Sequence, residues 1–266
     1  MSIPGPESGA PQRQAPQFHL PTVAEALASL MQTVVVALFL LTFVLQPYLI
    51  PSESMERTLL VGDFLLVNKQ VFAPAGGLTR WLLPYHEVER GDIVFFHHAQ
   101  PPFLVKRVVG LPGDRLRIED GRVTVNGAPL DEPYAAFEPA ARNPFRDDFP
   151  PKIYTDPAVD PVWWRQMQNL TRDGELVVPQ GQYFVLGDNR NHSTDSRFWG
   201  FVDRQQIVAR PLVIYFSLSR PSTTDIDPSA QQATLQASDD RLGHDRQLSA
   251  RLTGFARWKR IFHIVH

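Results

Sequence analysis

Two serines and one lysine of this 266-residue chain have the types and surroundings that nucleophilic chemistry requires. Ser52 and Ser54 lie in the run 51–55, Pro-Ser-Glu-Ser-Met, and Lys106 lies in the apolar run 103–109. A serine hydroxyl is a weak nucleophile until a base takes its proton. Lysine can be that base only when it is neutral, and lowering its pKa from about 10.4 to about 7 by burial costs roughly 4.6 kcal/mol. The pattern leaves two interpretations of Lys106: a buried base, or a solvated residue at a strand edge.

Other catalytic arrangements find little support. No Gly-x-Ser-x-Gly turn surrounds either serine, and no Ser-x-x-Lys occurs anywhere. The run 86–90 has an arginine where the second histidine of a zinc-binding helix should stand. The adjacent His97 and His98 would point to opposite faces of a strand, so we interpret them as structural or exposed. The absence of cysteine excludes thiol catalysis, disulfides and cysteine metal sites. We expect neither a metal nor a cofactor.

A long apolar segment precedes the serines. No charged residue occurs between Glu25 and Glu53, and residues 26–48 would form a helix about 35 Å long, enough to span a bilayer core with some tilt. We predict a transmembrane anchor over 26–48, after a disordered segment over 1–25. A buried helix of a soluble protein and a cleavable secretory signal are the alternatives. A cleavable secretory signal is disfavoured because no small-x-small cleavage site follows the segment.

The rest of the chain is typical of an all-β body. Short β-like runs bounded by turn residues recur along it, and the dipeptide Asn126-Gly127 predicts a hairpin. We predict a mainly β fold of antiparallel sheets built from residues 49–120 and 176–220. An irregular cap would be inserted at 121–175.

The end of the chain and the net charge give weaker indications of structure and binding partners. Residues 221–266 are predicted to form a loop and a basic tail, which could rest on anionic headgroups, lie on the surface or form an edge strand. The pair Trp163-Trp164 could touch lipid, although a small β core favours a buried position. Because 26 Lys and Arg balance 28 Asp and Glu, charge gives no reason to expect nucleic acid binding.

Three motifs follow one another along the chain. They are 51–55 with Thr58-Leu59 and Gly62-Asp63, then 105–114 (Val-Lys-Arg-Val-Val-Gly-Leu-Pro-Gly-Asp), then 187–202, which begins Gly-Asp-Asn-Arg. In this order, behind an apolar segment, they resemble the nucleophile, lysine and third motifs of bacterial type I signal peptidases (leader peptidases), a Ser–Lys dyad serine protease family. The resemblance covers 48 to about 216, and the cap matches only loosely.

The resemblance implies a role for each matched residue. Ser54 would be the nucleophile and Lys106 the general base, and the Ser52 hydroxyl and the Ser54 backbone N–H would form the oxyanion hole. Ser193 would hydrogen-bond and orient the lysine amine. Two further pairs would support the site: Asp195 with Arg197 as an ion pair, and Asp188 with Arg190 as braces of the loop.

Two structural expectations accompany these roles. Asp195 and Arg197, at i and i+2, would share one face of a strand and act as scaffold. Shallow substrate pockets would be lined by apolar positions around the dyad: Ile50, Pro51, Met55, Leu59, Leu65, Leu104 and Val105.

A member of this family would be a single-pass hydrolase of the cell (inner or cytoplasmic) membrane, with its catalytic domain on the outer face. It would remove signal peptides from exported preproteins after small-x-small (Ala-x-Ala) sites. Its partners would be preprotein signal peptides, membrane lipid and the secretion translocon, and not nucleic acid. The alternatives are a catalytically silent homologue that binds signal peptides, and a Ser–Lys self-cleaving protease.

One position departs from the family pattern. Arg57 stands where the family usually has proline, two residues after Met55. Proline would fix the backbone of the turn. The departure therefore puts the rigidity of this loop in doubt and leaves the dyad untouched.

Overall fold

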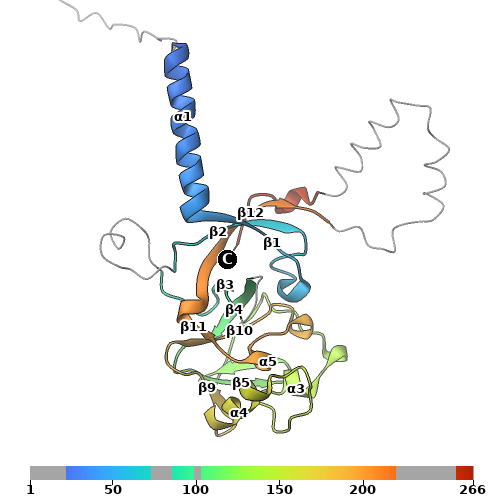
Figure 1. The fold of residues 1–266 in the computed structure, drawn as a ribbon. Helices are drawn as coiled ribbons and strands as arrows, with labels where there is room; N and C mark the ends of the chain where they lie inside the picture. Colours follow the sequence, from blue (N-terminus) through green and yellow to red (C-terminus); the bar gives the residue numbers. More distant parts are fainter. Residues whose placement is uncertain (1–21, 73–85, 99–102, 220–255, 266) are drawn as a thin grey trace, which may run out of the picture. The chain divides into compact units, whose positions relative to one another are not determined.

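The computed structural model describes residues 22–72, 86–98, 103–219 and 256–265 (Figure 1). The chain divides into two units, Met1–Leu40 and Leu41–His266. In the first unit, helix α1 (Val23–Phe39) begins at a reciprocal cap, in which the Thr22 amide donates to the Glu25 carboxylate and the Glu25 amide to the Thr22 hydroxyl. A short π-helix, η1 (Leu40–Val44), follows in sequence.

The helix predicted over 26–48 is shorter than expected. Residues 45–48 belong to strand β1 (Leu45–Leu49), which pairs with the next strand of the body. Pro47 offers a reason, because proline lacks the amide hydrogen that a continuing helix would use. In the part of the chain that the structure describes, no helix combines the length and the apolar character needed to cross a membrane.

The prediction of a mainly β body is confirmed, and all strand pairs in it are antiparallel. The first sheet has the order β1-β2-β12-β3-β4-β10-β11, and β13 pairs with β12. Its further strands are β2 (Asp63–Asn68), β3 (Ile93–Phe96), β4 (Leu104–Gly110), β10 (Gln182–Leu186), β11 (Val202–Asp203), β12 (Ile207–Ser217) and β13 (His263–Ile264).

The second sheet has the order β7-β6-β5-β9-β8. Its strands are β5 (Arg115–Glu119), β6 (Arg122–Val125), β7 (Ala128–Pro129), β8 (Thr171–Arg172) and β9 (Glu175–Val177). The predicted hairpin is confirmed between β6 and β7, where Asn126 and Gly127 both have positive φ, as a type I′ turn requires. Strand β5, assigned above to the core segment 49–120, pairs within this second sheet instead.

Short helices complete the body. They are α3 (Pro144–Asp147), α4 (Pro161–Leu170), α5 (Ser196–Trp199), and the 3₁₀ turns η2 (Glu53–Met55), η3 (Pro139–Ala141), η4 (Arg190–His192), η5 (Arg204–Gln206) and η6 (Trp258–Arg260). The cap is thus more regular than predicted, since α4 begins at an Asp160 N-cap followed by Pro161. Trp163 of α4 is 2% exposed, which confirms the core position for this residue.

A buried apolar cluster lies under the first motif. Met55 and Leu59 from the turn pack with Leu65 of β2 and Val105 of β4, and Met55 and Leu59 are fully buried. Burying one such side chain contributes about 1.5–3 kcal/mol. The packing of Met55 therefore fixes the turn that carries Ser54.

The last described residues hold the same turn from another side. Arg260 donates to both carboxylate oxygens of the fully buried Asp63 and to the Thr58 carbonyl, at 2.9 Å for the carbonyl. Arg257 donates to the Leu218 carbonyl at 2.6 Å. Because β13 also pairs with β12, residues 256–265 correspond to the edge-strand alternative rather than to a free tail.

Candidate active site

Ser54 and Lys106 meet in the interior of the body. The Lys106 Nζ donates to the Ser54 Oγ at 2.6 Å, and the two residues are 4% and 6% exposed. Ser54 comes from η2 and Lys106 from β4, 52 residues further along the chain. The sequence predicted this pair, and the geometry is the one that proton transfer between the two atoms requires.

Burial makes the lysine a usable base. It lowers the pKa of Lys106 to about 8, because the charged form loses its hydration. The negative charges of Asp195 and Asp188 oppose the shift, and the positive charge of Arg197 adds to it. At pH 7 about a tenth of the molecules therefore carry a neutral amine.

The neighbouring residue on β4 makes a separate ion pair. Arg107 donates from Nε and Nη2 to the two oxygens of Asp188, both at 2.8 Å, and its guanidinium lies 3.9 Å from the ring centre of Tyr134. Asp188 also accepts from the Thr58 hydroxyl at 2.6 Å. This carboxylate thus joins the strand that carries the lysine to the loop that follows the nucleophile.

The third motif lies directly against the nucleophile. The Asn189 amide donates to the Ser54 carbonyl at 3.1 Å. Gly187 approaches Ser54 and Ser193 so closely that an added Cβ would collide with the Ser54 carbonyl oxygen and the Ser193 hydroxyl. Glycine at this position is required by the close approach of the two segments.

Asp195 and Arg197 form the predicted ion pair, but not on a strand. Asp195 is the N-cap of α5, and Arg197 lies in the first turn of that helix, so the prediction of a shared strand face is wrong. Because the Asp195 side chain accepts from the Arg197 amide, it caps a helix rather than pairing in a sheet. Its carboxylate also accepts from Arg197 Nε and Nη2, both at 2.8 Å, and from the Gly187 amide at 3.0 Å. Burial would raise the pKa of Asp195, yet the charge and hydrogen bonds of Arg197 hold it below its usual value.

Arg190 braces the loop through the cap rather than through Asp188. It pairs with Glu132 in the interior, with one N–O distance of 3.0 Å, and its Nε donates to the Gly187 carbonyl at 3.1 Å. The Ala136 amide donates to the Asp188 carbonyl and the Arg190 amide to the Ala136 carbonyl. The segment around Ala136 thus runs beside the third motif as a parallel bridge.

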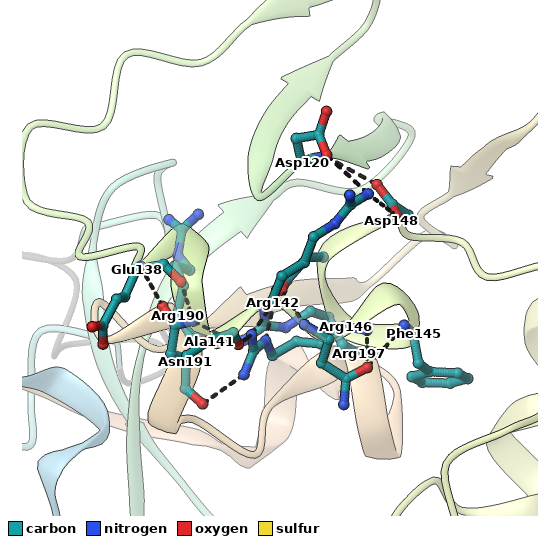
Figure 2. A network of polar contacts seen from close by, with 12 residues as sticks. Asp120, Glu138, Ala141, Arg142, Phe145, Arg146, Asp148, Arg190, Asn191 and Arg197 are labelled. Carbon is teal, nitrogen blue, oxygen red and sulfur yellow. Dashed lines mark hydrogen bonds and ion pairs between the residues drawn. The ribbon is translucent and has the colours of Figure 1, made fainter.

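Asn191 extends this connection into the cap (Figure 2). Its side chain accepts from the Glu138 amide at 2.7 Å and donates to the carbonyls of Glu138 and Ala141. Its own carbonyl accepts from Arg146 at 2.7 Å. The cap therefore orders the loop that faces the dyad.

Ser193 does not make the predicted hydrogen bond to the lysine amine. It is buried, and its Oγ forms no hydrogen bond of normal geometry in the structure, although it lies near enough to Asp195 to help lower that carboxyl pKa. The amine of Lys106 donates to Ser54 instead. Within the described residues, the hydroxyl of Ser193 faces Gly187.

Ser52 lies at the surface beside the nucleophile. Its Oγ is 3.5 Å from the Ser54 Oγ, and it lines an open cleft. That cleft of about 600 Å³ is also lined by Pro51, Glu53, Glu56, Leu60, Val61, His192, Ser219 and Arg257. The oxyanion-hole role that the resemblance implies for Ser52 stays a prediction.

The apolar positions expected to line substrate pockets are mostly covered. Ile50, Met55, Leu59, Leu65 and Val105 belong to the buried cluster under the turn and are at most 6% exposed. By contrast, Pro51 borders the open cleft, and Leu104 packs half-buried against a neighbouring cluster. Five of the seven positions thus form a floor beneath Ser54, and their contact with substrate stays a prediction.

Arg57 adopts a backbone conformation that proline cannot. Its φ is +90°, a value that L-residues other than Asn and Asp seldom take. Its Nη1 donates to the Ala135 carbonyl at 2.7 Å, next to the segment that pairs with the third motif. In this chain a side-chain tether to the cap takes the place of a stiff proline.

The arrangement is the one that a serine hydrolase with a lysine base needs. A scan against protein families matches residues 23–216 to "Signal peptidase, peptidase S26". Three curated relatives carry the name signal peptidase I. That of Leptolyngbya laminosa is 34% identical, over 84% of this chain and 92% of its own length. That of Pseudomonas fluorescens is 31% identical, over 77% of each chain. That of Aquifex aeolicus is 30% identical, over 79% of this chain and 91% of its own length.

The chain therefore belongs to the signal peptidase family, peptidase S26, whose members are serine endopeptidases that process signal peptides. The resemblance found in the three sequence motifs is confirmed.

Several residues that hold the site together escaped the sequence analysis. Arg107, Glu132 and Tyr134 surround the third motif, and Asp63 with Arg260 anchors the nucleophile turn. The arginine next to Lys106 was visible in the sequence as a second cation in an apolar strand. The other partners lie far apart in the chain, and no local pattern marks them.

The lowered pKa predicts that Lys106 destabilises the fold. Below pH 8 the amine is charged in both folded and unfolded chains, and folding must desolvate it. Above about pH 10.5 it is neutral in both, and the penalty vanishes. We expect Lys106→Met to be more stable than wild type by up to about 3 kcal/mol at pH 7. The advantage should shrink between pH 8 and 10.5 in urea unfolding experiments. The exposed Lys152→Met should show no such pH dependence, and a Lys106→Met protein less stable at pH 7 would contradict the assignment.

The backbone at Arg57 predicts that the residue usual in the family is harmful here. Proline has φ near −65° and cannot take +90°, so Arg57→Pro should lower stability by about 2 kcal/mol or more and reduce kcat. Arg57→Gly accepts the backbone angle and loses only the tether, so its effect should be smaller. Thermal unfolding and kcat measured on both variants would show whether proline is more harmful than glycine at position 57. A proline variant as stable and active as wild type would show that the turn does not hold this conformation.

Proposed function

We propose that the protein removes signal peptides from exported preproteins, with Ser54 as nucleophile and Lys106 as general base. The observation that carries the proposal is the 2.6 Å hydrogen bond between two buried side chains, one of which is a lysine with a lowered pKa. Membership of the signal peptidase family gives the substrate class.

Each step of the reaction has a group to perform it. The Ser54 Oγ attacks the scissile carbonyl carbon while neutral Lys106 takes its proton. The negative charge that develops on the carbonyl oxygen is stabilised by the Ser52 hydroxyl and the Ser54 amide. The Lys106 ammonium then protonates the leaving amine, which departs as the new N-terminus and leaves an ester on Ser54. Lys106, neutral again, takes a proton from a water that attacks this ester, and its ammonium returns the proton to the Ser54 Oγ as the C–O bond breaks and the signal peptide leaves.

We infer selection of small side chains from the packed residues directly beneath Ser54. The residues beneath Ser54 are packed and almost fully covered. A substrate strand lying over this floor would have little room for a large side chain next to the scissile bond. We therefore infer cleavage after small-x-small sites such as Ala-x-Ala.

We also propose that the enzyme is bound to the cell membrane by its N-terminal segment, with the catalytic domain outside. Helix α1 supports this, because it buries no residue and exposes large apolar side chains all round, including Leu30, Val35 and Leu38. On the body, exposed apolar side chains gather near β12 and β13, among them Leu212, Phe262 and Ile264. Membrane lipid, preprotein signal peptides and the secretion translocon are the partners this location implies.

The direct test is cleavage of a precursor by the detergent-solubilised full chain. Wild type should release the signal peptide after an Ala-x-Ala site and fail when the residue before the cut is replaced by tryptophan. Ser54→Ala and Lys106→Met should each lower kcat/KM about a hundredfold or more, because both groups act in the chemical step. The exposed Lys152→Met is the matched control and should cleave normally. Cleavage retained by either dyad variant would refute the mechanism.

The pH dependence separates lysine from histidine as the base. Because only neutral Lys106 can take the proton, kcat/KM should rise as pH increases through about 8. Replacing His97, His98 and His192 together by Gln should leave this rise in place. A folded triple variant that is inactive, or that has lost the alkaline limb, would assign the base to a histidine.

Membrane attachment has its own measurement. The full chain, expressed in bacteria, should stay with the membrane pellet after a sodium carbonate wash. Val35→Lys together with Leu38→Lys should release much of it, since each charge costs about 2.5–3.5 kcal/mol at the centre of a span. Val162→Lys, at an exposed valine of α4, is the matched control. If the variant with both Val35→Lys and Leu38→Lys stayed in the pellet as fully as Val162→Lys, α1 would not be the anchor.

A further inference from the structure

Strand β4 has an unoccupied edge next to the catalytic lysine. Val108 donates to the Asp92 carbonyl of the β3 side at 2.8 Å. Backbone groups alternate along an antiparallel strand, so Lys106 and Leu104 also face β3, while Val105 and Phe103 face the other way. On that other side β10 pairs with β4 only as far as Arg107. Among the described strands, none covers the outward groups of Val105 and Phe103.

Strand β1 presents a second open edge. Ile50 exchanges backbone hydrogen bonds with the Gly62–Asp63 side, at 2.9 and 3.0 Å, and Tyr48 is the next residue bonded to β2. The outward groups are therefore those of Leu49 and Pro47. Strand β1 ends the sheet, so its outer edge has no neighbouring strand in the described chain.

A single tyrosine joins these two edges. The Tyr48 hydroxyl donates to the Phe103 carbonyl at 2.6 Å, across 55 residues of sequence. Its ring packs edge-on against Phe95 with centroids 4.7 Å apart. Tyr48 and Phe103 also border a largely apolar cavity of about 280 Å³ whose wall includes Val67 and Val208. The Tyr48 hydroxyl thus bridges from β1 to the edge of β4. It occupies the Phe103 carbonyl, which an added strand would use as a hydrogen-bond acceptor.

We propose that Tyr48 is a positioning residue that competes with the substrate backbone for the Phe103 carbonyl. This rests on the proposed function and adds to it that an extended signal peptide pairs with the open edge of β4 beside Ser54. As the peptide enters, one of its backbone amides replaces the Tyr48 hydroxyl on Phe103. Binding therefore exchanges one hydrogen bond for another, and only a segment that is fully extended at this point can complete the exchange.

The proposal predicts that removing the Tyr48 hydroxyl changes KM and leaves kcat unchanged. Tyr48→Phe keeps the ring and its contact with Phe95 but frees the Phe103 carbonyl. The substrate then gains a bond without displacing one, so KM should fall about two- to tenfold, the equivalent of one hydrogen bond. Because the dyad is untouched, kcat should stay unchanged. In a Ser54→Ala background, the same change should tighten binding of a fluorescent signal peptide by a similar factor.

The control is Tyr154→Phe, which removes a hydroxyl that also donates to a backbone carbonyl, that of Val159 at 3.1 Å, but in the cap. It should alter neither KM nor peptide binding. An unchanged or raised KM for Tyr48→Phe would overturn the proposal, because the hydroxyl would then be irrelevant or would help to form the groove. An unfolded Tyr48→Phe protein would overturn it too, since the bond could not be given up during binding. Failure of wild type to cleave any precursor would instead reject the proposed function.

Discussion

The site depends on keeping one amine out of water. Lys106 has a pKa of about 8 mainly because the body covers it, and the nearby carboxylates of Asp195 and Asp188 act against this effect. Both carboxylates are neutralised by arginines of their own, Arg197 and Arg107. The two arginines thus limit how strongly the negative charges of Asp195 and Asp188 stabilise the charged form of Lys106. They allow buried carboxylates to brace the loop while the lysine remains a base.

Further ion pairs and hydrogen bonds connect the cap and residues 256–265 to the loops around the site. Asp188 reaches the nucleophile loop through Thr58, and Arg190 reaches the cap through Glu132. Arg260 holds the other end of the nucleophile loop through Asp63. Ser54 is therefore positioned by contacts from distant parts of the chain together with the burial of Met55 and Leu59 from the turn itself.

Sequence reasoning was strongest where chemistry and local pattern coincide. The Ser54–Lys106 pair, the β body and the Asn-Gly hairpin were all predicted, because each leaves a short, recognisable signal. It failed where tertiary contacts decide. Asp195 was expected on a strand but caps a helix, and Ser193 was expected to bind Lys106 but faces Gly187. The end of the N-terminal helix was also missed, since pairing with β2 takes over before the apolar run ends.

The ion pair between Arg260 and Asp63 constrains when the loop after Ser54 can be stabilised during synthesis of the chain. The two residues are 197 positions apart, so the loop after Ser54 gains this support only once Arg260 has been made. Contacts of such separation form late and slowly in folding. The loop after Ser54 therefore reaches its final support only after the strands between Asp63 and Arg260 have been made.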